Sequence, residues 1–311
     1  MYNLLEKLAD GQTYSFENLT ALLGCNDNEL LVQIQQLQQQ GIHIDTTLGE
    51  VKLLPQTALL NPEKLRDTLP NQVFYRPIIH STNQFLLENI KRLNKGDICT
   101  AESQTAGRGR RGRQWISPFA SQLMFSFIWQ VDARKPIDGL SSVVAMAINH
   151  TLIKLGGADI MLKWPNDILL KGRKLAGILI EIAHTENGQL NLVVGIGLNV
   201  DIPKDNQQID QSWANLTEIL PKIDRTSLLI ALIQQIYQEL ETFERVGINA
   251  EFQQKWQEVD AYFGETVNII TEKQVISGTE QGIDEHGYLK LLTNSGELLT
   301  FNGGEVSLRR K

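Results

Sequence analysis

Predicted strands in the middle of this chain do not alternate strictly with helices, and several of them follow one another directly. Short apolar runs predict six strands, at residues 73–79, 97–102, 122–130, 159–164, 175–183 and 190–197. Helical spacing of apolar residues predicts three helices, at residues 82–92, 138–155 and 226–244. Because parallel neighbours need long, usually helical crossovers, this order favours a mixed or antiparallel sheet with helices on one side. We therefore expect an α+β protein with a mixed central sheet.

The first 54 residues predict a separate small unit. Apolar residues at helical spacing predict three helices within residues 2–40, the third capped by Asp27 or Asn28 and ended by Gly41. Residues 42–44 and 51–54 then predict two short strands around a turn. Three helices followed by a hairpin form the outline of a winged helix-turn-helix.

Residues from about 262 onward are rich in glycine and branched apolar side chains, with turn signals between them. This composition favours a small β-barrel. A linker is expected near Pro55–Pro70. We therefore predict three domains, at residues 1–60, 70–258 and 262–311.

Composition excludes several classes of protein. No apolar run approaches the roughly 20 residues that span a bilayer, and the N-terminus lacks the charge pattern of a secretory signal. The two cysteines, Cys25 and Cys99, have no metal-ligand or CxxC neighbour. We expect a cytoplasmic protein without membrane contact or a disulfide framework. The net charge of −7 argues against general coating of nucleic acid but permits a local basic site.

The segment from Ser103 to Trp115 reads SQTAGRGRRGRQW, with four arginines and three glycines in residues 107–113. Glycine lets a backbone approach an anion closely, and arginine offers forked donors to phosphate or carboxylate oxygens. Such a loop suits an anionic ligand that must be covered from water. A solvated basic loop or a nucleic-acid patch is the competing interpretation, and the Arg/Gly run by itself slightly favours it.

A second segment, KWPND, follows an apolar strand. Pro165 is expected to end the strand ladder and to fix a bend that presents Lys163 and Asp167 on opposite sides of a corner. The lysine could neutralise a phosphate, and the carboxylate could orient an amine or hold a metal-bound phosphate. A hydrated turn is the commoner explanation of PND alone.

Three further positions are suggestive only in combination. Lys174 opens an apolar strand, which could aim a partly desolvated ammonium at an anion. The GIGLN turn could lay a ligand ring on bare glycine backbone while Asn199 bonds a heterocycle edge. Ser81 or Thr82 could be a simple helix N-cap. A surface lysine and a plain turn are the ordinary alternatives for the first two.

In this order and spacing the segments together strongly resemble the biotin–protein ligases, most closely the larger bacterial type that joins a winged-helix repressor domain to the ligase. The resemblance covers essentially residues 1–311, through STNQ, AESQTAGRGRRGRQW, KWPNDILL, GRKLAGILIE, VVGIGLN and GGEVSLR. It implies a central domain similar to class II synthetases and a C-terminal SH3-like barrel. Lipoate–protein ligases share this logic, but GRGRRGR and KWPND are typical of the biotin enzymes.

The resemblance also implies roles for individual residues. Those expected around biotin are Ser81, Thr82, Asn83, Gln104, Arg108, Gly109, Arg110 and Lys174. Those expected around ATP and the adenylate are Arg110, Arg113, Trp115, Lys163, Asn166, Gly197 and Asn199. The expected catalytic residues are Arg110, Lys163, Asp167 and Lys174, with Asp167 orienting or deprotonating the acceptor amine.

The implied reaction joins biotin to AMP with Mg·ATP and then transfers biotin to a lysine of a carrier protein. The implied partner is the biotin carboxyl carrier protein of acetyl-CoA carboxylase, and such ligases often form homodimers. No metal site formed by the protein's own residues is predicted, so Mg²⁺ would arrive with ATP. A DNA-binding regulator that only senses a ligand is the competing class, and it would form neither AMP nor pyrophosphate.

The N-terminal unit departs from the repressor pattern. Residues 1–54 contain two lysines against seven acidic residues, and residues 25–50 contain no lysine or arginine. DNA affinity depends heavily on basic contacts with phosphates. We therefore expect weak or no binding to operator DNA, with the unit kept as a structural or regulatory appendage. A retained repressor role on the biotin operon, through other residues of the unit, is the competing interpretation.

Overall fold

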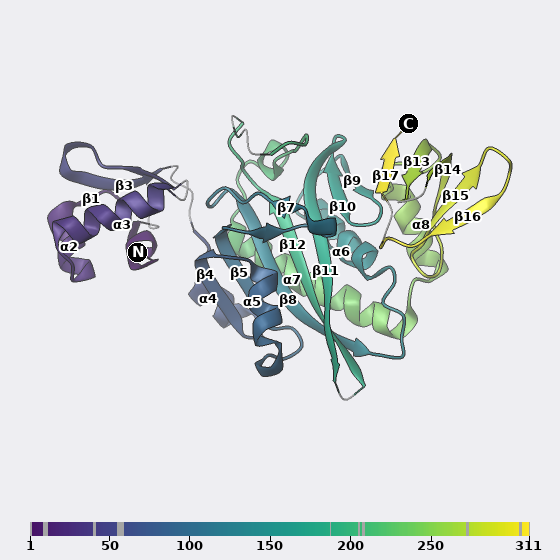
Figure 1. Cartoon of the computed structure of the whole chain (residues 1–311), viewed down its shortest axis with the longest axis horizontal. Helices are drawn as coiled ribbons and strands as arrows, with labels where there is room; N and C mark the ends of the chain where they lie inside the picture. Colours follow the sequence, from purple (N-terminus) through teal and green to yellow (C-terminus); the bar gives the residue numbers. More distant parts are fainter. Residues whose placement is uncertain are drawn as a thin grey trace.

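A computed structural model of the chain describes residues 2–8, 12–39, 42–54, 59–186, 188–204, 206, 209–271, 274–304 and 307–310. Figure 1 shows an N-terminal unit in purple, a large central unit in blue and green, and a C-terminal unit in yellow. The cap predicted at Gly41 and the start of the predicted linker at Pro55 lie outside the described residues.

The N-terminal unit packs three helices against a small sheet of strand order β1-β3-β2. Its elements are α1 (Tyr2–Leu8), β1 (Tyr14–Ser15), α2 (Phe16–Leu23), α3 (Asp27–Gln39), β2 (His43–Asp45) and β3 (Glu50–Leu54). Gly24 ends α2 in the left-handed conformation, with φ of 63°. The cap of α3 is Asn26, not Asp27 or Asn28 as predicted, because Asn26 Oδ1 accepts from Glu29 N at 3.0 Å while Glu29 Oε2 accepts from Asn26 N at 3.0 Å.

The central unit contains a seven-stranded sheet of order β4-β5-β8-β12-β11-β10-β9. Its strands are β4 (Val73–Ile79), β5 (Ile98–Gln104), β8 (Gln122–Asp132), β9 (Ile160–Lys163), β10 (Asp167–Leu170), β11 (Arg173–Glu186) and β12 (Gln189–Asn199). The β4–β5 pair is parallel and the other pairs are antiparallel, so the predicted mixed sheet is confirmed. The strand β10 was not predicted, because the proline before it was taken only as the end of a strand.

Helices cover both faces of this sheet, so the expectation of helices on one side was wrong. The helices α6 (Leu140–Lys154) and α7 (Arg225–Val246) share a large core with Phe125 and Phe127 of β8. Ile128, the next residue along β8, packs instead with Leu86 of α5 (Thr82–Asn89) on the opposite face. Alternating side chains of a fully buried strand serve both layers, and a run without alternation does not reveal which helix lies on which face.

Much of the predicted linker forms a helix, α4 (Pro62–Thr68), capped by Asn61, whose side chain accepts from Lys64 N at 2.9 Å. A buried ion pair ties this region to the sheet. Arg225 Nη2 of α7 lies 2.7 Å from Glu102 Oε2 of β5, and Leu60 N donates to the other oxygen of Glu102 at 2.7 Å.

The C-terminal unit is a five-stranded antiparallel sheet of order β16-β15-β14-β13-β17, preceded by α8 (Ala250–Val259), a helix that was not predicted. Its strands are β13 (Thr266–Ile270), β14 (Val275–Ile283), β15 (Leu289–Thr293), β16 (Leu298–Phe301) and β17 (Ser307–Arg310). This unit braces the β9–β10 turn, because buried Trp164 donates through Nε1 to Gly287 O at 3.0 Å. Among the helices of the described ranges, none has the length and apolar character to cross a bilayer.

Candidate functional site

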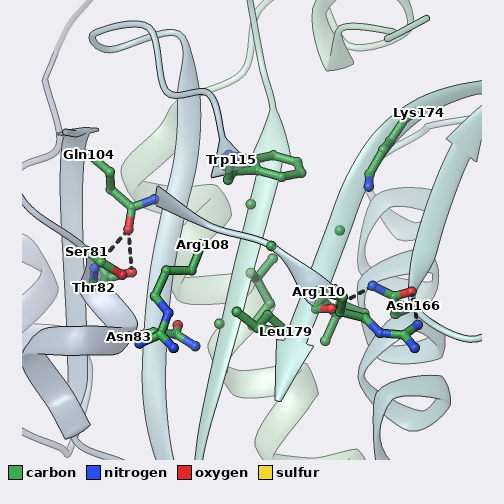
Figure 2. Close-up of a pocket in the computed structure, with 16 residues that line it drawn as sticks. Ser81, Thr82, Asn83, Gln104, Arg108, Arg110, Trp115, Asn166, Lys174 and Leu179 are labelled. Carbon is green, nitrogen blue, oxygen red and sulfur yellow. Dashed lines mark hydrogen bonds between the residues drawn. The ribbon is translucent and has the colours of Figure 1, made fainter. Parts of the chain in front are cut away.

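A pocket opens on the α5 face of the central sheet, where β11 and β12 meet the arginine–glycine loop (Figure 2). It holds roughly 470 Å³ of empty space, including the part open to solvent. Its lining brings together predicted residues from distant parts of the chain: Ser81, Thr82, Asn83, Gln104, Arg108, Gly109, Arg110, Trp115, Asn166, Lys174 and Gly197. All eight residues expected around biotin are in this set.

Glycines on β11 and β12 create the floor of the pocket. A Cβ atom at Gly195 would stand 2.0 Å from Asn83 Oδ1, and one at Gly197 would stand 2.4 Å from Trp115 Cε2. Only bare backbone leaves room for these side chains. The sequence suggested that a ligand ring lies on this backbone, and in this structure the ring that lies on Gly197 is the indole of Trp115.

One end of the pocket is a hydrogen-bonded cluster at the start of α5. Thr82 N donates to Gln104 Oε1 at 2.8 Å, and the Thr82 and Ser126 hydroxyls are 2.7 Å apart. Ser126 Oγ donates to Asn83 Oδ1 at 2.5 Å. Of the two N-cap candidates, Ser81 and Thr82, it is Ser81 that caps the helix and accepts from the Gln84 N–H. The Ser81, Thr82 and Asn83 side chains are buried, so water competes little for their polar groups.

The arginine–glycine loop is folded over the pocket as a short hairpin of β6 (Gly107–Arg108) and β7 (Gln114–Trp115). Arg110 donates to Asn166 Oδ1 at 2.7 Å and to the carbonyl of Gly303 in the C-terminal unit. Arg111 donates to Ser307 Oγ at 3.0 Å. The loop therefore bonds to both the central and the C-terminal units instead of lying free in solvent.

The β9–β10 turn places Lys163 and Asp167 directly opposite each other in an antiparallel pair. Such a pair has its side chains on one face of the sheet, so the expectation that they lie on opposite sides of the corner was wrong. The chain reverses completely at the cis Trp164–Pro165 bond. Asp167 Oδ1 lies 2.8 Å from Lys174 Nζ, which is also 5.5 Å from the centre of the Trp115 ring. Three predicted charges and an aromatic ring thus converge.

Two of the charged side chains are partly desolvated. Burial lowers the pKa of the Lys163 ammonium from its usual value, against the opposing effect of Asp167. Burial likewise lowers the pKa of the Arg110 guanidinium, again against Asp167, while Arg111 and Arg113 lower it further. Cations in such surroundings interact strongly with an arriving anion, because little water screens them.

A second, more basic cavity adjoins the first and shares Gly109, Arg110, Trp115, Asn166 and Lys174 with it. Its further lining includes Arg111, Arg113, Lys163, Asp167 and Arg309. A third cavity beside Trp115 contains Gln122, Asn199 and Trp213. Every predicted site residue lines one of these three adjoining cavities.

Asn199 is buried, and its amide is engaged within the protein. Its Oδ1 accepts from Gln122 Nε2 at 2.9 Å, and its Nδ2 donates to Lys174 O at 3.1 Å. The residue therefore holds the backbone of Lys174 in addition to lining the third cavity. Gln122 in turn accepts from Trp115 Nε1 at 3.2 Å.

Sequence reasoning missed several residues of the site. Glu181 bonds to Arg108 and Asn83, and Gln122, Trp213 and Arg309 line the second and third cavities. The GILIE run contains Glu181, and a carboxylate within an otherwise apolar stretch of strand could have drawn attention to it. Nothing local distinguishes the other three, since their place depends on chain segments far away in sequence.

Comparison with known proteins agrees with this geometry. Residues 75–199 match the Biotin/lipoate A/B protein ligase family, and residues 262–309 match the Biotin protein ligase C terminal domain. The bifunctional ligase/repressor BirA of Escherichia coli (strain K12) is 37% identical over 310 residues, covering 98% of this chain and 96% of that protein.

Two further relatives are informative. A biotin–[acetyl-CoA-carboxylase] ligase of Mycobacterium tuberculosis is 30% identical and covers 69% of this chain and 80% of that protein. The solved structure of a biotin protein ligase from Aquifex aeolicus in complex with biotin and ATP superposes with a TM-score of 0.69 at 30% identity, covering 78% of this chain and all of that one. The chain therefore belongs to the biotin protein ligase family.

Proposed function

We propose that this protein activates biotin with ATP and transfers the biotinyl group to a lysine of the biotin carboxyl carrier protein of acetyl-CoA carboxylase. The observation that carries this proposal is the junction of the first pocket with the basic cavity at Arg110, Asn166 and Lys174. A carboxylate in the first pocket would there meet a phosphate in the second, with cations on both sides. Relatives named as ligases of acetyl-CoA carboxylase support the choice of carrier.

In the first step an oxygen of the biotin carboxylate attacks the α-phosphorus of ATP, and pyrophosphate leaves. Both reactants are anions, so cations that face the forming bond reduce repulsion and stabilise the charge-rich transition state. We assign this role to Arg110, Lys163 and Lys174. The desolvation of Lys163 and Arg110 strengthens their attraction for phosphate oxygens.

In the second step the neutral amine of the carrier lysine attacks the acyl carbon, an amide bond forms and AMP leaves. The amine must lose a proton, and we assign its orientation or deprotonation to Asp167. This carboxylate lies beside Lys174 and lines the basic cavity, close to where the acyl phosphate would form.

The remaining predicted residues divide between the two substrates. For biotin we propose Ser81, Thr82, Asn83, Gln104, Arg108 and Gly109, together with Arg110 and Lys174. For ATP and the adenylate we propose Arg113, Trp115, Asn166, Gly197 and Asn199, together with Arg110 and Lys163. Closure of residues 103–115 would protect the reactive anhydride from water.

Mg²⁺ would accompany ATP. Within the described ranges no three metal-ligating side chains gather, which suits an ion held mostly by phosphate oxygens and water with one or two carboxylates. Asp167 and Asp210 line the basic cavity and supply such carboxylates. Bound there, the ion would neutralise charge on the leaving pyrophosphate.

We further propose the domain division 1–60, 70–258 and 262–311. The three helices and small sheet of the N-terminal unit suit a winged helix-turn-helix, and the five C-terminal strands suit an SH3-like barrel. The central sheet suits a class II synthetase-like domain. A homodimer and a cytoplasmic location, where ATP and the carrier occur, complete the proposal.

The test is to incubate the protein with biotin, Mg·ATP and the carrier domain and to weigh the carrier by mass spectrometry. We expect a gain of one biotinyl group, and none when lipoate replaces biotin. Lys174→Ala should lower the rate by about 100-fold or more, as removal of one transition-state contact often does. Lys171→Ala, whose side chain is 59% exposed, is the matched control. An unmodified carrier with the parent protein would refute the proposed function.

A further inference from the structure

Glu181 lies on β11, two residues beyond Leu179 of the pocket lining, and none of the roles assigned above includes it. We infer that Glu181 is a positioning residue that holds the arginine–glycine loop closed at the biotin end of the pocket, and so sets how long the protein retains biotinyl-AMP. This inference rests on the proposed function and adds a residue with a separate task.

The Glu181 carboxylate bonds to both sides of the pocket entrance. Its Oε1 lies 2.6 Å from Arg108 Nη2, within the loop, and its Oε2 accepts from Asn83 Nδ2 at 2.8 Å, at the start of α5. Its side chain is only 18% exposed. A short, partly buried bond between a guanidinium and a carboxylate is among the stronger hydrogen bonds in proteins.

Asn83 continues this chain of bonds into the pocket. Its Oδ1 accepts from Ser126 Oγ at 2.5 Å, and the Ser126 hydroxyl is 2.7 Å from that of Thr82. Figure 2 shows Arg108 reaching from the loop ribbon down to Asn83, away from Lys174 and Asn166 at the far end. Glu181 therefore connects the loop to the polar groups assigned to biotin.

The loop is attached separately at its other end. Arg110 bonds to Asn166 and the carbonyl of Gly303, and Arg111 bonds to Ser307. These contacts lie on the side of the basic cavity and would remain when Glu181 is altered. Loss of the Arg108–Glu181 pair should then release the arginine–glycine loop at the biotin end of the pocket. The residues assigned to phosphate chemistry should keep their positions.

Gln84 of α5 also accepts a hydrogen bond from Arg108, between its Oε1 and Arg108 Nη1, at 2.7 Å. It is a neutral acceptor, so its bond with the guanidinium lacks the attraction between opposite charges that the bond with Glu181 has. Glu181 is therefore the partner that holds Arg108 by an ion pair. An isosteric Glu181→Gln substitution removes the charge while keeping the size of the side chain.

The experiment uses the full chain with biotin and Mg·ATP in the absence of carrier. The rate of pyrophosphate formation in a single turnover reports adenylation, and the rate at which biotinyl-AMP appears free in solution reports retention. We expect Glu181→Gln to keep adenylation within about twofold and to release biotinyl-AMP roughly tenfold faster. Glu244→Gln, which breaks a pair of the same 2.6 Å length with Lys95 and carries a carboxylate that is 28% exposed, should change neither rate.

A double variant separates positioning from general damage. Because Arg108→Gln and Glu181→Gln remove the same ion pair, the double variant should release biotinyl-AMP more slowly than the product of the single effects predicts. Multiplicative effects would overturn the inference, as would a Glu181→Gln protein that retains biotinyl-AMP normally. If the parent protein forms no biotinyl-AMP, the proposed function fails instead.

Discussion

Single residues matter most where a side chain lies on bare backbone. Gly197 is the clearest case, because the indole of Trp115 occupies the space that any larger residue at 197 would need. The same indole faces Lys174 Nζ at 5.5 Å and donates to Gln122. Because Gly197 has no Cβ atom, the Trp115 ring can lie against its backbone, where it lines all three cavities.

We expect Gly197→Ala to displace the indole of Trp115, because the new Cβ would stand 2.4 Å from Cε2 of that ring. The KM for ATP should rise about tenfold, a cost typical of overpacking by one methyl group at a closely packed site. The measurement is the initial rate of pyrophosphate release as ATP is varied. On a Trp115→Ala background the same substitution should add little, and an equal effect there would contradict the argument.

At the scale of elements, α8 is joined to β14 by two buried carboxyl groups. Asp260 follows α8 and accepts from Trp256 Nε1 at 2.7 Å and from Tyr262 N at 3.0 Å. Burial and the neighbouring Asp260 raise the pKa of Glu280 from its usual range to about 10. Glu280 is therefore protonated near neutral pH. This pair lies beside the strand that carries Lys163, since Ala261 N donates to Leu162 O at 2.7 Å.

We expect Glu280→Gln to weaken the dependence of the free energy of unfolding on pH between about 4.5 and 10. Because the folded pKa of Glu280 is raised above the unfolded value of about 4.5, its stabilising contribution is complete below pH 4.5 and is lost as pH rises toward 10. Through this one group, the free energy of unfolding changes by at most about 1.4 kcal/mol per pH unit.

Thermal unfolding between pH 5 and pH 9 measures this effect. The Tm of Glu280→Gln should fall less than the Tm of the parent between pH 5 and pH 9. At pH 9 the variant should therefore be the more stable protein. Glu251→Gln, at an exposed carboxylate paired with Lys255, is the control and should follow the parent curve. Equal pH dependence of Glu280→Gln and the parent would show that Glu280 titrates normally.

At the scale of the whole molecule, the N-terminal unit and the ligase differ sharply in charge. The exposed side of α3 carries Asn28, Val32, Gln35 and Gln36, and residues 25–50 hold no basic side chain. The arginines and lysines that could neutralise phosphates are instead concentrated around the basic cavity, at Arg110, Arg111, Arg113, Lys163, Lys174 and Arg309. Contact between α3 and a DNA duplex would therefore release few counterions, so this source of DNA affinity would be small.

We expect no saturable binding of a biotin-operon promoter fragment at about 0.15 M salt and micromolar protein, with fluorescence anisotropy as the measurement. A variant with Asn28→Lys, Gln35→Lys and Gln36→Lys adds three cations to the exposed side of α3 without disturbing the Asn26–Glu29 cap. It should gain binding that weakens steeply with salt. Nanomolar binding by the parent would show that the repressor activity in the name of its Escherichia coli relative extends to this chain.

Much of the molecule follows from local sequence. The mixed sheet, most of its strands and the helices α5, α6 and α7 were predicted, because periodicity, glycine and proline act over a few residues. The site residues were expected from the resemblance to a family, and the structure brings them together around three adjoining cavities. The arginine–glycine loop and the KWPND segment also suit phosphate and carboxylate chemistry, but each by itself favoured an ordinary surface loop or turn, and only their combination indicated the family.

Tertiary structure decided how those pieces face each other. The return of β10 onto β9 puts Lys163 and Asp167 on one face, and α5 lies on the face opposite α6. The partners of Arg108 and Glu280 come from other elements, 73 and 20 residues away at Glu181 and Asp260. Such pairings depend on register, burial and the packing of distant segments, and no local pattern encodes them, because each side chain acquires its partner only when the sheet and its helices assemble.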